Sequence, residues 1–227
     1  MNKKVTNLLY QAAQGEKLSQ DQRQILLDNG YPLHALTGGT HLIHQDEPLE
    51  EVLFLISGNV MITQFNRSGK RNIASYLEAP QFFGLIEYLT GRREPISGVM
   101  SVSEVEYLRL SSQSMEYLLK SPVFYPYFLK YLAQLNQQTM THAMMERFLD
   151  DKILLMDHLF HLAENQSLPA KITEKKQDLS DLLHIGLRSL YRYLSELESE
   201  GYLTRKGQSL IIDKDQFLKL SDVLSHQ

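Results

Sequence analysis

Arg188 and Arg192 lie one helical turn apart in a segment whose side chains suit contact with the edges of DNA bases. A guanidinium group can donate two parallel hydrogen bonds to guanine O6 and N7, which discriminates against a wrong base by about 1–3 kcal/mol. Ser189 and Tyr191 add hydroxyl groups to the same stretch, and the chain becomes acidic from Glu196 onward. Because DNA is a polyanion, only the front of this segment can face a duplex.

Two short helices separated by a tight turn are predicted around these side chains. Apolar residues recur at helical spacing in both segments, at Leu179, Leu182, Leu183, Leu187, Leu190, Leu194 and Leu197. The intervening His184-Ile185-Gly186 is too short for anything but a turn, and Gly186, which has no β-carbon, suits the entry to the second helix. This order is typical of a helix-turn-helix, in which the start of the second helix enters the major groove.

A two-stranded wing is predicted after the second helix. Residues 202–204 and 209–212 are the two strands, and they flank the basic turn Arg205-Lys206-Gly207-Gln208. A basic tip can meet a phosphate beside the groove, which positions a protein on DNA without reading its sequence. The alternative is a plain helical hairpin with a solvated charged face.

Composition excludes several kinds of site and location. The absence of cysteine excludes disulfides, thiolate metal sites, cysteine-ligated iron–sulfur clusters and cysteine nucleophiles. No segment approaches the roughly 20 apolar residues of a membrane span, and the N-terminus lacks the apolar core of a signal peptide. We therefore expect a cytoplasmic protein with no membrane partner. Its net charge of −4 gives no global attraction to DNA, so binding would depend on where individual charges lie.

The first half of the chain alternates short β-rich runs with turn signals. These runs cover residues 41–44, 52–56, 60–65, 72–77, 98–102 and 105–110. Gly58-Asn59 and Arg67-Ser68-Gly69-Lys70 are the tight connections. Closely spaced short strands with glycine turns favour a small antiparallel barrel or roll.

One continuous helix is predicted from about residue 122 to residue 148. Apolar side chains alternate at spacings of three and four along it, at Tyr125, Phe128, Leu132, Leu135 and Thr139. A dimer seam is one way to bury this stripe, and packing of the helix on its own β domain is the alternative. Tyr125, Tyr127 and Tyr131 could line a ligand cavity or simply pack.

Together these features resemble the Crp/Fnr family of bacterial transcription regulators over nearly the whole chain. The resemblance rests on residues 53–60, Gly69-Lys70 with Ser75-Tyr76-Leu77, Phe83-Gly84, Phe148-Leu149-Asp150 and the helix-turn-helix. It implies an α+β fold: an N-terminal antiparallel β-roll like a cyclic-nucleotide-binding jelly roll (1–121), a long dimerisation helix (122–149) and a C-terminal winged helix-turn-helix (150–227).

The resemblance also implies contacts and partners. Its DNA-contacting positions fall on Gln177, Gly186, Leu187, Arg188, Arg192 and Lys206, beside Ser189 and Tyr191. Leu187 stands where members that recognise the best-known operator carry arginine, so we expect an altered base preference. The expected partners are a palindromic DNA duplex, a second copy of the chain and RNA polymerase.

The chain departs from the cyclic-nucleotide-binding branch at the ligand. The position of that branch's ribose-binding glutamate is Leu85, and its phosphate-binding Arg-Ser pair becomes Pro95-Ile96. Neither can replace those contacts, so we expect no tight cyclic AMP binding, unless a two-residue slip brings Arg93 to the phosphate. Candidate residues for a different small effector are Gly84, Leu85, Ile86, Glu87, Arg93, Thr139 and Met140. The alternative is a β-roll without ligand, serving as a protein-interaction or structural module.

Metal and catalytic sites are not predicted. His41 and His44 are three apart on a strand and should point to opposite faces, so they cannot share an ion. His158 and His161 share a helix face but lack a third ligand. The chain has no glycine-rich phosphate loop, nucleophile elbow or HExxH motif, so we expect neither an enzyme nor a resident cofactor.

Overall fold

The computed structural model describes residues 1–65, 71–148 and 150–225, with side chains described except at 142–148. The chain divides into two compact units, Met1–Leu135 and Asn136–Gln227, so that the division falls within the long helix. The expected turn at residues 67–70 and the expected junction at Leu149 lie outside the described residues. The proposed boundaries at 121 and 149 stay predictions.

The first unit begins with a helical hairpin that the sequence analysis did not anticipate. Its helices are α1 (Lys3–Ala13) and α2 (Gln20–Asp28). Ser19 and Gln22 form a reciprocal capping box at the start of α2. The buried face of α1 carries Val5, Leu8, Leu9 and Ala12, which join the core of the first unit.

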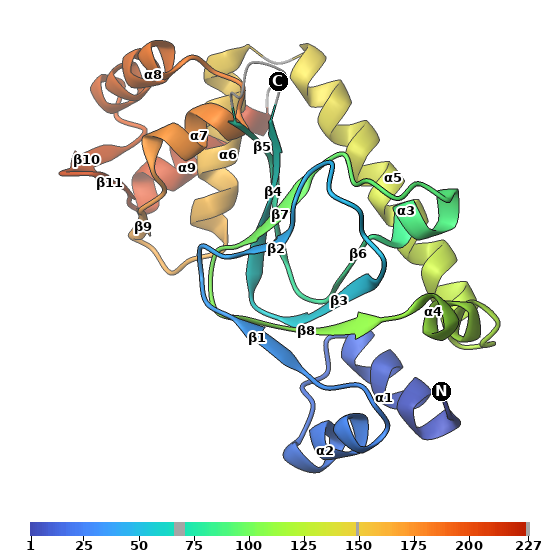
Figure 1. Ribbon diagram of the computed structural model, residues 1–227. Coiled ribbons are helices and arrows are strands. Elements are labelled where there is room, and N and C mark those ends of the chain that lie inside the picture. The colour runs from blue at the N-terminus through green and yellow to red at the C-terminus, as the bar shows by residue number, and fades with distance from the viewer. Residues whose placement is uncertain (66–70, 149, 226–227) are drawn as a thin grey trace. The chain divides into compact units, whose positions relative to one another are not determined.

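Two four-stranded antiparallel sheets form the β-roll within the described residues (Figure 1). The first sheet has the order β1 (His34–Leu36), β8 (Val105–Leu110), β3 (Val52–Ser57), β6 (Gln81–Phe83). The second has the order β2 (His41–Ile43), β7 (Gly98–Ser101), β4 (Asn59–Phe65), β5 (Arg71–Glu78). The six predicted strands are confirmed, whereas β1 and β6, of three residues each, were not anticipated.

Glycine is required at two turns of the roll. Gly58, between β3 and β4, has a φ of 91° and packs against the Glu104 carbonyl, where no β-carbon fits. Gly84 has a φ of 80° and lies between β6 and the short helix α3 (Leu85–Thr90). A β-carbon at Gly84 would come within 2.5 Å of the Leu49 side chain. These two residues set the close connections that the sequence pattern indicated.

The long helix α5 (Phe124–Phe148) follows α4 (Ser112–Leu119) and begins in the core of the first unit. Phe124 and Phe128 are 0% and 2% exposed, and the Phe128 ring packs edge-on against Phe82 at 5.2 Å. The assignment of Phe128 to a dimer seam is therefore wrong, because its side chain is already buried within its own unit. Tyr125 and Leu129, on another side of the helix, are each 54% exposed.

Two tyrosines fix the start of α5 to the rest of the first unit. The Tyr127 hydroxyl donates to the Ala13 carbonyl at 3.2 Å, and burial raises the pKa of Tyr127 to about 12. The Tyr131 hydroxyl donates to Gln81 Oε1 at 2.8 Å and accepts from the Phe82 N–H at 3.1 Å. Tyr127 and Tyr131 thus pack, as the second of the two interpretations predicted.

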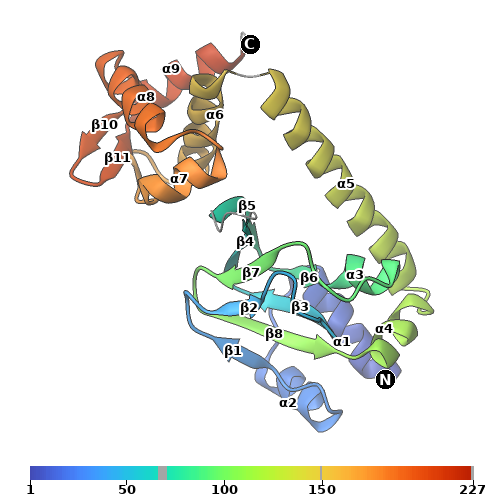
Figure 2. The ribbon, with the colours of Figure 1, turned by 45° about the horizontal axis from the view of Figure 1, so that its top comes forward.

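The second unit is a winged helix-turn-helix around a core of its own (Figure 2). Its elements are α6 (Asp151–Glu164), β9 (Ala170–Ile172), α7 (Lys176–Leu182), α8 (Leu187–Ser199), β10 (Thr204–Lys206), β11 (Ser209–Ile212) and α9 (Lys214–Ser225). The second predicted wing strand is confirmed as β11, whereas the first lies at Thr204–Lys206 and not at 202–204. The two pair with each other, and β9 adds a third strand beyond β11. The turn of the wing is shorter than predicted, because β10 runs through Lys206.

Candidate DNA interface and effector pocket

Helix α8 has one buried face and one exposed face. Leu190, Leu194 and Leu197 are fully buried in the core of the second unit. Leu187 and Tyr191 lie on the outer face and are 37% and 49% exposed. The predicted DNA-contacting side chains thus lie on the opposite side of α8 from the leucines.

The turn between α7 and α8 is closed by the first helix. The Ser180 hydroxyl donates to the Ile185 carbonyl at 2.7 Å inside the core. The left-handed residue of this turn is His184, with a φ of 56°. Gly186 has a φ of −57° and open space where a β-carbon would lie, so its lack of a side chain is not what the turn requires. That corrects the conformational reason given for Gly186.

The wing is fixed to the first helix of the motif. The Lys176 ammonium, at the start of α7, donates to the Gln208 carbonyl in the wing turn at 2.9 Å. Burial lowers the pKa of Lys176 below its ordinary value. Next to it, the Gln177 side chain donates to Asp181 Oδ1 at 2.8 Å. The starts of α7 and the wing therefore form one connected surface.

All eight predicted DNA-contacting residues belong to this surface. They are Gln177 on α7, Gly186 in the turn, Leu187, Arg188, Ser189, Tyr191 and Arg192 on α8, and Lys206 on β10. Each is exposed except Ser189, which is half-buried.

The acidic end of α8 is neutralised by cations of the same unit. Lys152 of α6 lies 2.8 Å from Glu200 and 3.4 Å from Glu196. Glu198 accepts from the Arg205 backbone N–H at 2.8 Å and from Arg205 Nε at 2.6 Å, and these bonds lower the pKa of Glu198. Arg205 of the predicted basic tip is thus paired with Glu198.

The cations at the front of α8 are held loosely. Arg192 Nε is 3.7 Å from Glu196, its guanidinium carbon lies 4.8 Å from the Tyr193 ring centroid, and its side chain is 62% exposed. Arg188 and Lys206 make no ion pair with any residue that the structure describes. Both can turn toward a phosphate or a base edge without breaking an existing contact.

The predicted effector residues do not form one site. Leu85 is 1% exposed and belongs to the apolar core, whereas Ile86 is 55% exposed. Thr139 and Met140 belong to the other compact unit and are exposed. Gly84, Glu87 and Arg93, by contrast, line a common pocket.

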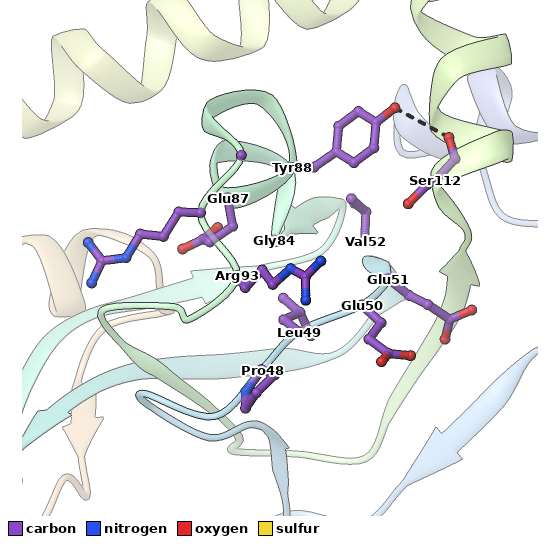
Figure 3. A pocket seen from close by; sticks show the side chains of 12 residues that line it. Pro48, Leu49, Glu50, Glu51, Val52, Gly84, Glu87, Tyr88, Arg93 and Ser112 are labelled. Atoms are coloured by element: carbon purple, nitrogen blue, oxygen red, sulfur yellow. Dashed lines mark hydrogen bonds between the residues drawn. The ribbon is translucent and has the colours of Figure 1, made fainter.

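That pocket, of about 420 Å³, lies between α3 and the segment that leads into β3 (Figure 3). It is lined by Pro48, Leu49, Glu50, Glu51, Val52, Gly84, Glu87, Tyr88, Gly91, Arg92, Arg93 and Ser112. The Leu49 N–H of one wall donates to the Arg93 carbonyl of the other at 2.8 Å, and just outside the lining the Asp46 N–H donates to the Pro95 carbonyl at 2.9 Å. Sequence reasoning missed Glu50, for which the acidic run before β3 was the available signal, and Tyr88 on α3, for which there was none.

Comparisons with known proteins agree with this architecture. The family of the cyclic nucleotide-binding domain matches residues 33–121, from before β1 to the end of α4. The cAMP-activated global transcriptional regulator CRP of Haemophilus influenzae is 23% identical over 188 residues, which cover 79% of this chain and 83% of that protein. The CRP of Salmonella typhimurium is 22% identical over 188 residues, 79% of this chain and 89% of that protein. Residues 33–121 thus match a cyclic nucleotide-binding domain, and the chain is similar to CRP regulators over 79% of its length.

Solved structures of bacterial regulators share the fold. The c-di-GMP responsive regulator CLP of Xanthomonas campestris superposes with a TM-score of 0.73 at 17% identity, covering 86% of this chain and 99% of that chain. A putative Crp/Fnr regulator from Eubacterium rectale gives a TM-score of 0.72 at 11% identity, covering 90% and 95%. The predicted α+β class is confirmed. The curated relatives are named as transcriptional regulators, in agreement with the expectation that the chain is not an enzyme.

One geometric expectation about the histidines is wrong. The His41 and His44 rings stack with centroids 4.7 Å apart, because β2 carries an irregularity between His41 and Ile43 and ends there. Within the described residues no cluster of three or more His, Asp or Glu groups could hold a metal ion. In the part of the chain that the structure describes, every helix is too short or too polar to cross a membrane.

Proposed function

We propose that this protein is a dimeric, sequence-specific DNA-binding transcription regulator of the Crp/Fnr type. The observation that carries the proposal is the charge arrangement of α8, whose acidic end is paired within its own unit while Arg188 and Arg192 face solvent. Arginine at the start of an inserted helix can read guanine. Leucine at position 187 supports an operator that differs from the best-known one of the family.

Dimerisation through α5 and its neighbour α3 is part of the proposal. Tyr125 and Leu129 of α5 are large, apolar and exposed, and so are Ile86 and Leu89 of α3 in the same unit. A second copy of the chain would remove this surface from water, which favours association by roughly 25 cal/mol per Å² before entropic costs. Such a dimer would present two recognition helices to a palindrome. RNA polymerase as a partner and a cytoplasmic location remain predictions.

The effector of this regulator is proposed to be a small molecule other than cyclic AMP. Leu85, Pro95 and Ile96 supply neither an acceptor for a ribose hydroxyl nor a cation for a cyclic phosphate. Micromolar affinity for cyclic AMP or cyclic GMP in calorimetry would contradict this part. The alternative, a ligand-independent regulator with a structural or protein-binding β-roll, is favoured by the burial of Leu85 in the core.

Selection of bound sequences from a random duplex library tests the proposal. We expect a palindrome with half-sites about 10–10.5 base pairs apart, the spacing of one helical turn. The double variant Arg188→Ala, Arg192→Ala should enrich nothing while still forming a dimer in sedimentation. Failure of the native protein to enrich any sequence, with or without cell extract, would refute DNA recognition.

A further inference from the structure

The pocket beside α3 holds charged groups of both signs that the fold does not use. Figure 3 shows Arg93 extending toward the segment that carries Glu50 and Glu51, with Glu87 on the wall formed by α3. The charged atoms of Glu50, Glu87 and Arg93 have no hydrogen bond or ion pair with any described residue. Glu51 differs, because it lies 3.6 Å from Arg109. Arg92 donates from Nε to the Glu94 carbonyl at 2.7 Å.

The remaining lining is apolar. Between the charged groups the walls are formed by Pro48, Leu49, Val52 and the ring of Tyr88. The Tyr88 hydroxyl donates a hydrogen bond to the Ser112 carbonyl at 3.3 Å. At about 420 Å³ the pocket falls within the range of small-molecule sites, roughly 300–1,000 Å³. A ligand that fits must therefore carry an anion, a cation and an apolar part.

We propose that this pocket binds a free α-amino acid with an apolar side chain. Arg93 would pair with the carboxylate in the bidentate geometry that guanidinium groups favour. Glu50 and Glu87 would accept hydrogen bonds from the ammonium group, and the side chain would lie against Leu49, Val52 and Tyr88. Leu85, Pro95 and Ile96, which stand at the nucleotide-contacting positions of the family, are not among the lining residues, although Gly84 and Glu87 of the same segment are.

Helix α3 connects this pocket to the exposed apolar surface of the first unit. Gly84, Glu87, Tyr88 and Gly91 line the pocket, whereas Ile86 and Leu89 are 55% and 42% exposed. Occupancy would hold α3 against the segment before β3 and thereby fix the position of Ile86 and Leu89. Control of operator binding by the amino acid rests on the proposed function, whereas binding of the amino acid in the pocket is independent of that function.

Calorimetry with the purified full-length chain and L-leucine or L-phenylalanine tests the pocket. N-acetyl-L-leucine lacks the ammonium group and L-leucinamide lacks the carboxylate, so each should bind at least about ten-fold more weakly than L-leucine. Arg93→Gln should weaken L-leucine by a similar factor and leave L-leucinamide unchanged. Glu94→Gln, next to Arg93 but outside the lining, should change neither. Glu87→Gln should reduce the discrimination against N-acetyl-L-leucine, and Glu50→Gln with Glu87→Gln should remove it.

The outcomes separate the pocket from the regulator. Absence of binding by both amino acids at millimolar concentration, or equal binding of L-leucine and L-leucinamide, would overturn the amino-acid site even if an operator is found. Specific binding of L-leucine together with no enriched duplex would support the site and refute the regulator. A change of at least about ten-fold in operator affinity on adding L-leucine, abolished by Arg93→Gln, would support both.

Discussion

The candidate DNA interface and the pocket beside α3 differ in the sign of the charges that have no partner among the described residues. In the second unit, Lys152 and Arg205 pair with the acidic end of α8, and the exposed cations Arg188 and Lys206 remain. In the first unit, the pocket beside α3 contains the carboxylates of Glu50 and Glu87 and the guanidinium of Arg93, which pair with no described residue. A surface of one sign suits a polyanion, whereas a cavity of both signs suits a small zwitterion. In both places, the signs of the charged groups without partners indicate which kind of ligand would bind.

The first unit can present its pocket only if its own core holds it together. The largest expected effect on the free energy of unfolding tests this. Phe128→Ala should lower the free energy of unfolding by about 3–5 kcal/mol, because it empties a fully buried aromatic site against Phe82. Leu129→Ala, one residue on and exposed, is the matched control. It should cost far less in dilute protein, while weakening self-association. Urea denaturation followed by circular dichroism would measure the free energy of unfolding of both variants. Equal losses of stability would mean that Phe128 does not belong to the core.

The cations of the second unit should separate into one that reads bases and one that contacts the backbone. Arg188→Ala should cost about 1–3 kcal/mol on the selected operator and relax specificity at one position of each half-site. Lys206→Ala should weaken all duplexes alike and reduce the slope of log K against log salt by about 1. Titrations at several salt concentrations distinguish the two. A uniform effect from Arg188→Ala would assign it to the phosphates instead.

A third prediction concerns a charge pair that the first unit does satisfy. Arg23 of α2 donates to both carboxylate oxygens of Glu106 on β8, and the hydrogen bond from Arg23 holds the pKa of Glu106 below its ordinary value. A carboxylate with a lowered folded-state pKa stabilises the fold above its unfolded pKa, and that stability is lost as the pH falls through the folded pKa. Arg23→Ala should cost roughly 1 kcal/mol or less near neutrality, because the pair is partly solvated. In the variant, acid should destabilise less between pH 5 and the folded pKa; an unchanged pH profile of unfolding would contradict the pair's contribution.

The smallest expected effect is at Gly186. Because its φ is −57° and its surroundings are open, Gly186→Ala should change the free energy of unfolding by only about 0.5 kcal/mol or less in either direction. Thermal melts would show this. A large loss would restore the view that the turn needs a residue without a β-carbon.

Sequence patterns predicted the elements whose signals are local. The strands of the roll and both helices of the motif follow from alternation, leucine spacing and glycine turns. Three-residue strands such as β1, β6 and β9 are too short to carry a period. Helix α1 was missed although Val5, Leu8, Leu9 and Ala12 have helical spacing, so that signal was present and not used.

The candidate sites were predictable to different degrees, because only one of them is formed by a continuous segment of the chain. The front of α8 is one continuous segment, so its exposed residues could be named from sequence. The pocket joins segments about 40 residues apart through hydrogen bonds between Leu49 and Arg93. The Arg205–Glu198 pair needs the wing folded back along α8, and the His41–His44 stack needs an irregular strand. None of these is a periodic feature of the chain.

The Tyr131 hydroxyl makes helix rotation and loop movement mutually dependent in the first unit. It bonds the Phe82 N–H, and Phe82 precedes Gly84, where α3 turns, by two residues. If a shift of that turn moves Phe82, it would lengthen this bond unless α5 moves with it. Tyr131→Phe would keep the ring and remove the linkage. Ligand and operator would then each bind with nearly native affinity, while the free energy that couples them would shrink toward zero.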